Sequence, residues 1–331
     1  MTRPRLRARL GAALILSTLA VAACGGTSSS SAGASGASGT TTSGASAASG
    51  GITVRTAQFT WSAARLTNAV LARIAAAHPE LGVAALKTTD LAPAAAWAGA
   101  ARGDIDLLTE VALPNQQAMA DKAKDRITLL HQTYGGAAQG WFVPSYAVAP
   151  GGAAAGLTSV TQLNQFASAF GGKLYDADPG WVTTAQNKKR LAGYGLHLTQ
   201  VASSEAAELA ELKRAYDAKK PIVVYLYHPH WVFSRYQLTQ LAEPTPYSDG
   251  CLTTGSGACA MPAYSAWTAA STDLAAKAPK FVALLKHLEI ALPDMEAMLA
   301  KVDVDKQSAD AVAQQWVTDH TAQVSAWLTN G

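Results

Sequence analysis

Four large aromatic side chains stand where strands of this chain are expected to end, two in each half of the folded part. They are Trp61, Trp141, Trp181 and Tyr227. In an α/β protein, ligands bind at the carboxyl edge of the sheet. The faces of such rings attract a cation without N–H groups, such as a quaternary ammonium, and each desolvated ring contributes about 2 kcal/mol or more. The pattern therefore predicts a box of rings around a cation.

Two imidazoles beside the fourth ring allow another interpretation. His228 and His230 flank Pro229 at the end of the apolar run from Val223. In an extended chain residues i and i+2 share a face, so both rings could meet one metal ion. Two ligands do not complete a site, and no His, Asp or Glu cluster elsewhere supplies more. A metal-ion-binding lipoprotein that uses this pair is the alternative.

Motifs of catalysis are missing from the sequence. It has no Gly-x-Ser-x-Gly elbow, no His-Glu-x-x-His and no Walker glycine loop. We therefore expect no enzyme and no cofactor. An exported enzyme or an assembly lipoprotein that keeps the fold without a ligand is a further alternative.

The N-terminus has the features of a bacterial lipoprotein signal. Arginines at positions 3, 5, 7 and 9 precede the apolar run Leu10–Val21, which is shorter than the roughly 20 residues that span a bilayer. Small residues then lead directly to Cys24. We predict a signal peptide over 1–23, lipidation of Cys24 and a flexible Ser/Gly/Ala tether over 24–51. The mature chain would be extracytoplasmic and held at the membrane by its lipid.

Charge and cysteines agree with export. The whole chain carries +3, and losing the four arginines of the signal leaves −1, so a basic surface for nucleic acid is not expected. Cys251 and Cys259 flank a short Gly/Ser loop. In an oxidising compartment this pair predicts a disulfide.

Strands alternate with helices through the remaining 280 residues or so, which predicts an α/β fold of two lobes. Strand 52–59 leads into a helix over 62–77, and a helix is expected from Thr158 or Ser159 to Phe170. A last helix, about Ser308 to Leu328, carries two tryptophans on its buried face. The Pro/Gly/Ala stretch 149–156 is the predicted first crossing. Lobe 1 is then 52–148 plus 245–331, and lobe 2 is 149–244.

Five stretches, in conserved order, resemble the glycine betaine/choline-binding lipoproteins of osmoprotectant ABC importers (OpuAC/ProX-like). They are Phe59-Thr-Trp61, Gly103-Asp-Ile-Asp-Leu107, Gly140-Trp-Phe-Val-Pro-Ser-Tyr146, Asp178-Pro-Gly-Trp181 and Tyr227-His-Pro-His-Trp231. The resemblance implies a two-lobed periplasmic-binding-protein fold, type II-like, with the ligand cleft between the lobes. It also implies a non-catalytic monomer that works with an ABC permease and its ATPase.

The resemblance assigns roles residue by residue. Trp61 and Trp141 match ligand-stacking tryptophans, and Trp181 follows a turn near the ligand. Tyr227 falls where many members have tryptophan, and His230 matches a histidine at the ligand's carboxylate end. The ligand would be a small quaternary ammonium solute: glycine betaine, proline betaine, choline or carnitine.

One position departs from the family. Ala112 stands where members often carry a tryptophan. The cleft is then roomier at this point, or another ring fills it. Tyr134, Tyr146 and Tyr175 are the candidates, and we include Tyr146 among the predicted ligand-binding residues.

Overall fold

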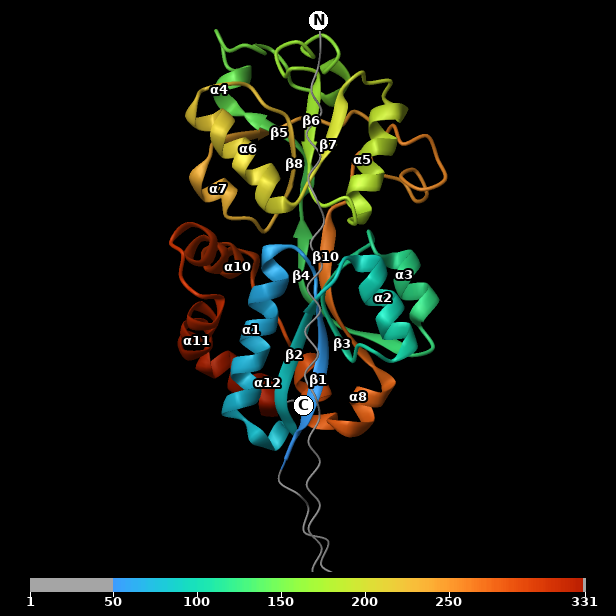
Figure 1. Ribbon diagram of the computed structural model, residues 1–331, viewed down its shortest axis with the longest axis vertical. Helices are drawn as coiled ribbons and strands as arrows, with labels where there is room; N and C mark the ends of the chain where they lie inside the picture. Colours follow the sequence, from blue (N-terminus) through green and yellow to red (C-terminus); the bar gives the residue numbers. More distant parts are fainter. Residues whose placement is uncertain (1–49, 330–331) are drawn as a thin grey trace, which may run out of the picture. The chain divides into compact units, whose positions relative to one another are not determined.

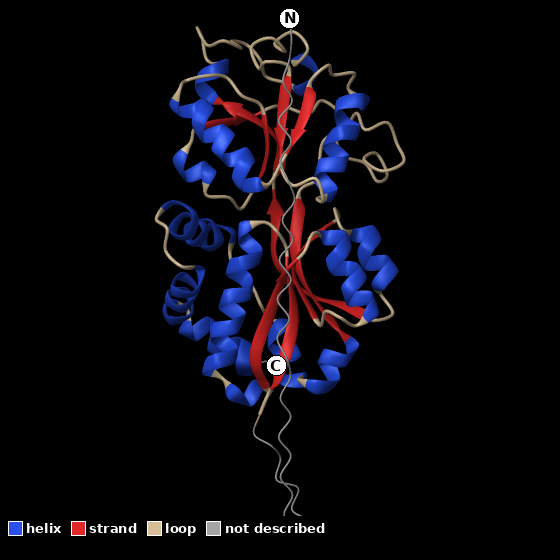
Figure 2. Ribbon diagram, in the orientation of Figure 1, coloured by secondary structure: helices blue, strands red, loops and turns tan. Residues whose placement is uncertain are grey.

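Each half of the folded chain is built on a five-stranded sheet with helices on its faces (Figures 1 and 2). The computed structural model describes residues 50–329. In the first sheet the strand order is β2-β1-β3-β10-β4. Strands β1, β2 and β3 are parallel, and β10 runs antiparallel to both β3 and β4. The bounds are β1 Ile52–Gln58, β2 Val83–Asp90, β3 Leu107–Leu113, β4 Ile127–Ala137 and β10 Tyr264–Ser271.

Helix α1 (Ser62–Ala77) shows why the first lobe folds as the sequence predicts. Its stripe of Leu66, Val70 and Ile74 is fully or almost fully buried, because residues three and four apart share one helix face. The other helices of this lobe are α2 Pro93–Arg102, α3 Gln117–Ala123, α8 Thr272–Lys277, α9 Pro279–Leu285, α10 Leu292–Leu299, α11 Ala309–Asp319 and α12 Thr321–Thr329. A short 3₁₀ turn covers Pro79–Leu81, and a π-helical turn, Ala300–Val304, follows α10.

The second sheet repeats the strand pattern of the first, in the order β7-β6-β8-β5-β9. Again three strands are parallel and the fourth runs against its two neighbours. The strands are β5 Gln139–Pro144, β6 Lys173–Asp176, β7 Thr199–Ala202, β8 Val224–Tyr227 and β9 Leu238–Gln240. Helices α4 Ser145–Val148, α5 Val182–Gly193, α6 Glu205–Asp217 and α7 Val232–Arg235 belong to this lobe. The two-lobed periplasmic-binding-protein fold is therefore confirmed.

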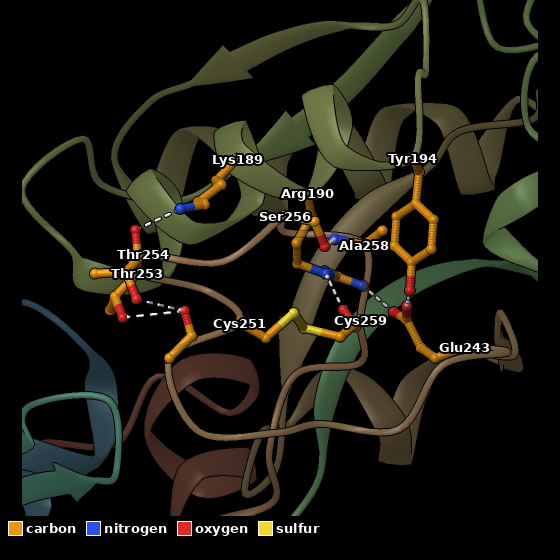
Figure 3. Close-up of a disulfide and its surroundings, with 11 residues drawn as sticks. Lys189, Arg190, Tyr194, Glu243, Cys251, Thr253, Thr254, Ser256, Ala258 and Cys259 are labelled. Carbon is orange, nitrogen blue, oxygen red and sulfur yellow. Dashed lines mark hydrogen bonds and ion pairs between the residues drawn. A yellow bond between two sulfur atoms is a disulfide. The ribbon is translucent and has the colours of Figure 1, made fainter.

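The chain crosses between the lobes at other points than the sequence suggested. Strand β5 pairs with β8 and β9, so the first crossing is at Ala138 and not at 149–156. All six residues of β5 are buried, as expected for a strand inside a sheet that is covered on both faces. The return comes just before Tyr264, the first residue of β10. The segment from 245 to about 261, including the disulfide loop, packs on α5 of the second lobe (Figure 3).

Two helix predictions were wrong in part. After a 3₁₀ turn at Val160–Gln162, most amides as far as Ala169 bond to carbonyls three residues back, so the expected helix to Phe170 is a series of tight turns. The Asn164 side chain bonds the backbone at Gly195 and His197, which fixes this shape. The last helix is broken at His320 into α11 and α12.

Several predictions concern residues that the structure does not describe. The signal peptide, Cys24 and the tether as far as residue 49 lie outside the described residues. Within residues 50–329, no helix is both long enough and apolar enough to cross a membrane.

Candidate functional site

A pocket between the two lobes gathers rings from both. We call it the ring pocket, and its empty volume is about 430 Å³, including the part open to solvent. The first lobe contributes residues from the end of β3, from the turns after β1 and β3, and from the starts of α2 and β10. The second lobe contributes residues of β5, β8 and the start of α5. The lining residues are Trp61, Pro93, Ala112, Asn115, Gln116, Gln139, Trp181, Val182, Thr183, Tyr225, Tyr227 and Tyr264.

Three of the four predicted rings meet in this pocket. Trp61 and Trp181 occupy equivalent places, each at the N-cap of the helix that follows a parallel strand, α1 and α5. Their ring centroids are 5.4 Å apart with the planes nearly perpendicular. Trp181 lies 5.7 Å from Tyr227, also edge to face. Phe59 stacks on Trp61 at 4.4 Å from behind. The rings thus support one another across the gap between the lobes.

The polar atoms of Trp181 and of the pocket tyrosines are bonded to the protein. The Trp181 indole donates to Thr60 Oγ1 at 2.7 Å, across the lobes. The hydroxyls of three tyrosines also donate hydrogen bonds to protein groups. Tyr227 donates to Glu205, Tyr225 to Gln139 and Tyr264 to the His228 carbonyl. Burial raises the pKa of each of these phenols, so each keeps its proton. What these side chains offer a ligand is therefore apolar surface and ring faces.

Neutral polar groups line the other part of the pocket. Asn115 and Gln139, one from each lobe, exchange amide hydrogen bonds of 3.3 Å. Gln116 accepts from the Trp97 indole. Val182 and Thr183 open α5, where backbone N–H groups lack helical partners and attract negative charge. Among the described residues that line this pocket, none is Lys, Arg, Asp or Glu.

A carboxylate and an imidazole lie directly behind Tyr227. Glu205 accepts the tyrosine hydroxyl, and His230 Nε2 is 3.5 Å from the same carboxylate oxygen. His230 is 2 % exposed, and its ring meets Tyr227 edge to face at 5.4 Å. Its Nδ1 accepts the Val232 amide. The structure therefore puts His230 behind the ring wall, outside the lining of the pocket.

A second buried carboxylate lies in the first lobe. Glu110 is 1 % exposed and accepts hydrogen bonds from Thr67 and Tyr134. Burial raises its pKa to about 7. Its φ is +58°, a left-handed conformation that is uncommon outside glycine. Strained backbone of this kind clusters near functional sites, and Ala112 of the pocket follows two residues later.

Trp141 is the predicted ring that the structure places elsewhere. It is 0 % exposed, and its indole donates to Asn187 at 2.9 Å. The guanidinium of Arg190 covers the ring, with Cζ 4.1 Å from its centroid. Arg190 in turn pairs with Glu243 and donates to the Cys259 carbonyl (Figure 3). Burial lowers the Arg190 pKa to about 10, which leaves it charged at neutral pH.

Tyr146 is also remote from the ring pocket. It lies on α4, where its hydroxyl donates to the Lys220 carbonyl at 2.9 Å. Its ring meets Tyr216 edge to face at 5.3 Å, and the Lys219 ammonium lies 4.9 Å from the ring centroid. These contacts give it a role in packing the second lobe.

The two histidines of the metal alternative have separate partners. His228 Nδ1 is 2.7 Å from Glu296 of the first lobe, and its ring stacks on Phe233. His230 faces Glu205 and Tyr227. In residues 50–329 no three His, Cys, Asp or Glu side chains come together in a way that could hold a metal ion. The geometry gives this alternative no support.

Ala112 does line the pocket, and the rings near it are not those suggested from the sequence. Tyr264 and Tyr225 are in the lining, whereas Tyr134 donates to Glu110 behind it and Tyr175 packs in the second lobe. Tyr225 could have been predicted, because residue i−2 of a strand shares the face of Tyr227. Tyr264 carried no local signal, since it reaches the pocket through the pairing of β10 with β3 and β4.

Comparison with known proteins gives the same class as the fold. The family model described as the substrate-binding domain of an ABC-type glycine betaine transport system, OpuAC, matches residues 52–319. Lactococcal OpuAC, closed on glycine betaine, is similar with a TM-score of 0.70 and 25 % identity, and the match covers 83 % of this chain and 99 % of that one.

Two more solved structures share the fold. A choline-binding protein of an ABC transporter, in complex with choline, has a TM-score of 0.70 at 20 % identity over 84 % of this chain and 91 % of its own. The glycine betaine/L-proline-binding protein ProX of Borrelia burgdorferi has 0.69 at 21 % identity, over 83 % and 96 %.

The matched family consists of solute-binding proteins of ABC transporters and not of enzymes. The chain belongs to the OpuAC family, the substrate-binding domains of ABC-type glycine betaine transport systems. The resemblance found in the sequence is thereby confirmed.

Proposed function

We propose that this protein captures a quaternary ammonium solute in the ring pocket, against Trp61, Trp181 and Tyr227. The observation that supports this most is the composition of the ring pocket. It has rings from both lobes, the polar atoms of Trp181 and Tyr227 are bonded to protein, and its described lining has no cationic side chain. A quaternary ammonium has no N–H to donate and gains from ring faces. The start of α5, with Val182 and Thr183, suits a carboxylate at the other end of the solute.

Titration calorimetry with glycine betaine and with choline tests the proposal. Three rings at about 2 kcal/mol each, with an anchored second end, suffice for micromolar binding. Trp181→Ala should weaken binding roughly 30-fold, because it removes one of these rings. Trp316→Phe, in α11, is the control and should not change affinity. The proposal fails if the unaltered protein binds neither solute below millimolar concentration.

The proposal includes delivery of the solute to an ABC permease by a protein held to the membrane through lipidated Cys24. The family is one of importer components, and the signal pattern before Cys24 supports the anchor. Cys24→Ala should move the full-length protein from the membrane fraction to the soluble fraction of expressing cells. Equal membrane association of both forms would rule the anchor out.

A further inference from the structure

Glu205, the first residue of α6, touches both the ring wall and the other lobe. One carboxylate oxygen accepts the hydroxyl of Tyr227 and lies 3.5 Å from His230 Nε2. The other oxygen lies 3.5 Å from Ser62 Oγ, in the first turn of α1. Glu205 is 8 % exposed, although Glu is rarely buried without a partner. A buried carboxylate that joins two lobes needs an explanation beyond helix capping.

From the first lobe, the turn Thr60-Trp61-Ser62 contacts Trp181 and Glu205 of the second lobe. Thr60 accepts the Trp181 indole, Trp61 packs edge to face on the same ring, and Ser62 reaches Glu205. Thus one three-residue turn contacts Trp181 directly and reaches Tyr227 through Glu205. Thr60, Ser62 and Glu205 do not line the ring pocket and instead line a separate groove.

We infer that Glu205 is a positioning residue, which fixes the Tyr227 ring in the wall of the pocket and links that ring to lobe closure through Ser62. This rests on the proposed function. A phenol without a partner can turn about its side-chain bonds, whereas a hydrogen bond to a buried carboxylate holds it in one orientation. Because the second carboxylate oxygen meets Ser62 only when the lobes are together, closing the protein and ordering the ring favour each other.

A purely structural role for Glu205 is the competing explanation. As the first residue of α6 it would stabilise that helix through its charge, whatever residue stood at 227. Replacing Glu205 would then lower stability, and its effect on ligand affinity would be the same with and without the Tyr227 hydroxyl. The two explanations therefore differ in whether the effects of the Glu205 and Tyr227 substitutions on ligand affinity depend on each other.

A double-mutant cycle read by ligand affinity separates them. Calorimetry with glycine betaine and choline is run on Glu205→Ala, Tyr227→Phe and the double variant, with near-ultraviolet circular dichroism as a check of folding. Glu205→Ala should weaken binding about tenfold, since a hydrogen bond to a buried charge is lost. In the Tyr227→Phe background the same change should have at most a threefold effect, because no hydroxyl is left to hold.

Two further variants complete the test. Glu205→Gln keeps an oxygen that accepts the phenol and should restore affinity to within threefold. Glu211→Gln, half-buried on the same helix and paired only with Arg214 among the described residues, should leave affinity unchanged. Equal losses with and without the Tyr227 hydroxyl, or no loss in Glu205→Ala, would overturn the inference.

If Glu205→Ala does not fold, ligand affinities of Ser62→Ala, Tyr227→Phe and their double variant test the inference instead. Each should weaken binding, and their double variant should be no weaker than the worse single one; additive losses contradict the link. If the unaltered protein binds neither solute, the proposed function fails and the inference with it. Binding by the unaltered protein without coupling defeats the inference alone.

Discussion

Two groups of aromatic rings in this protein meet positive charge in opposite ways. Trp141 already carries a cation, since the buried Arg190 guanidinium lies on its face and is neutralised by Glu243. Trp61 and Trp181 face a pocket whose described lining has no cation of its own. The same attraction between ring and cation thus holds the fold together in one place and, in our proposal, a solute in the other. What separates the two groups is whether the protein supplies the charge.

The strongest test of this contrast removes each kind of ring. Trp141→Ala should lower the free energy of unfolding by about 3–5 kcal/mol, because it opens a cavity in a closed core. It also takes away the support of Arg190. Solute affinity of the folded fraction should stay within about threefold. Urea unfolding and calorimetry measure the two effects. If Trp141→Ala weakens binding as much as Trp181→Ala does, the division into structural and ligand-facing rings is wrong.

A buried carboxylate, Glu110, should make the stability of the protein depend on pH. Burial raises the Glu110 pKa to about 7 from an ordinary 4.5, and within residues 50–329 no cation pairs with it as Arg190 does with Glu243. The folded state therefore binds this proton more tightly than the unfolded state. The contribution of Glu110 to stability is greatest below pH 4.5, falls as the pH rises to about 7 and is constant above. The fall should be roughly 3 kcal/mol.

Glu110→Gln isolates this effect, because an amide cannot ionise and can still accept from Tyr134. The variant should match the unaltered protein near pH 4 and exceed it in stability near pH 8. Asp176, whose pKa burial raises to about 6, is present in both proteins and cancels in the difference. Parallel stability curves for the two proteins would show that Glu110 is ionised when buried.

Removing the disulfide tests whether the loop that contacts Arg190 contributes to stability alone or also to solute affinity. Cys251 and Cys259 are joined in the structure, and the loop between them lies on α5, where Arg190 and Lys189 donate to its carbonyls (Figure 3). Replacing both cysteines by serine should cost about 2–3 kcal/mol of stability. Affinity should be unchanged. A loss of affinity would mean that α5 transmits disorder from the loop to Trp181.

The smallest effect is expected at Tyr146. Tyr146→Phe removes a hydrogen bond to the Lys220 carbonyl and should cost about 1 kcal/mol. Solute affinity should be identical to that of the unaltered protein, because the ring is not in the pocket lining. A change in affinity would place a ligand contact on α4.

The sequence correctly predicted that a ring lines the pocket in those cases where the ring follows or ends a parallel strand whose carboxyl end lies at the pocket. Trp61 and Trp181 each stand at the turn into a helix, and Tyr227 ends β8, so local pattern and topology agree. Trp141 misled because β5 runs the other way: it starts at the pocket with Gln139, and Trp141 lies two residues deeper on the same face. A single strand does not reveal its direction in a sheet. The crossing points were misplaced for a related reason, since pairing between distant strands decides which lobe a segment joins.

The pairing of Ala137 with Tyr264 has a consequence for how such a chain can be divided. These two residues face each other in neighbouring antiparallel strands, and everything between them belongs to the second lobe. In topology, the second lobe is an insertion at the tip of a β-hairpin. A two-residue turn joining β4 to β10 would close that hairpin and give the first lobe as one continuous polypeptide. The excised piece would keep its own five-stranded sheet, its disulfide and the Trp141–Arg190 stack.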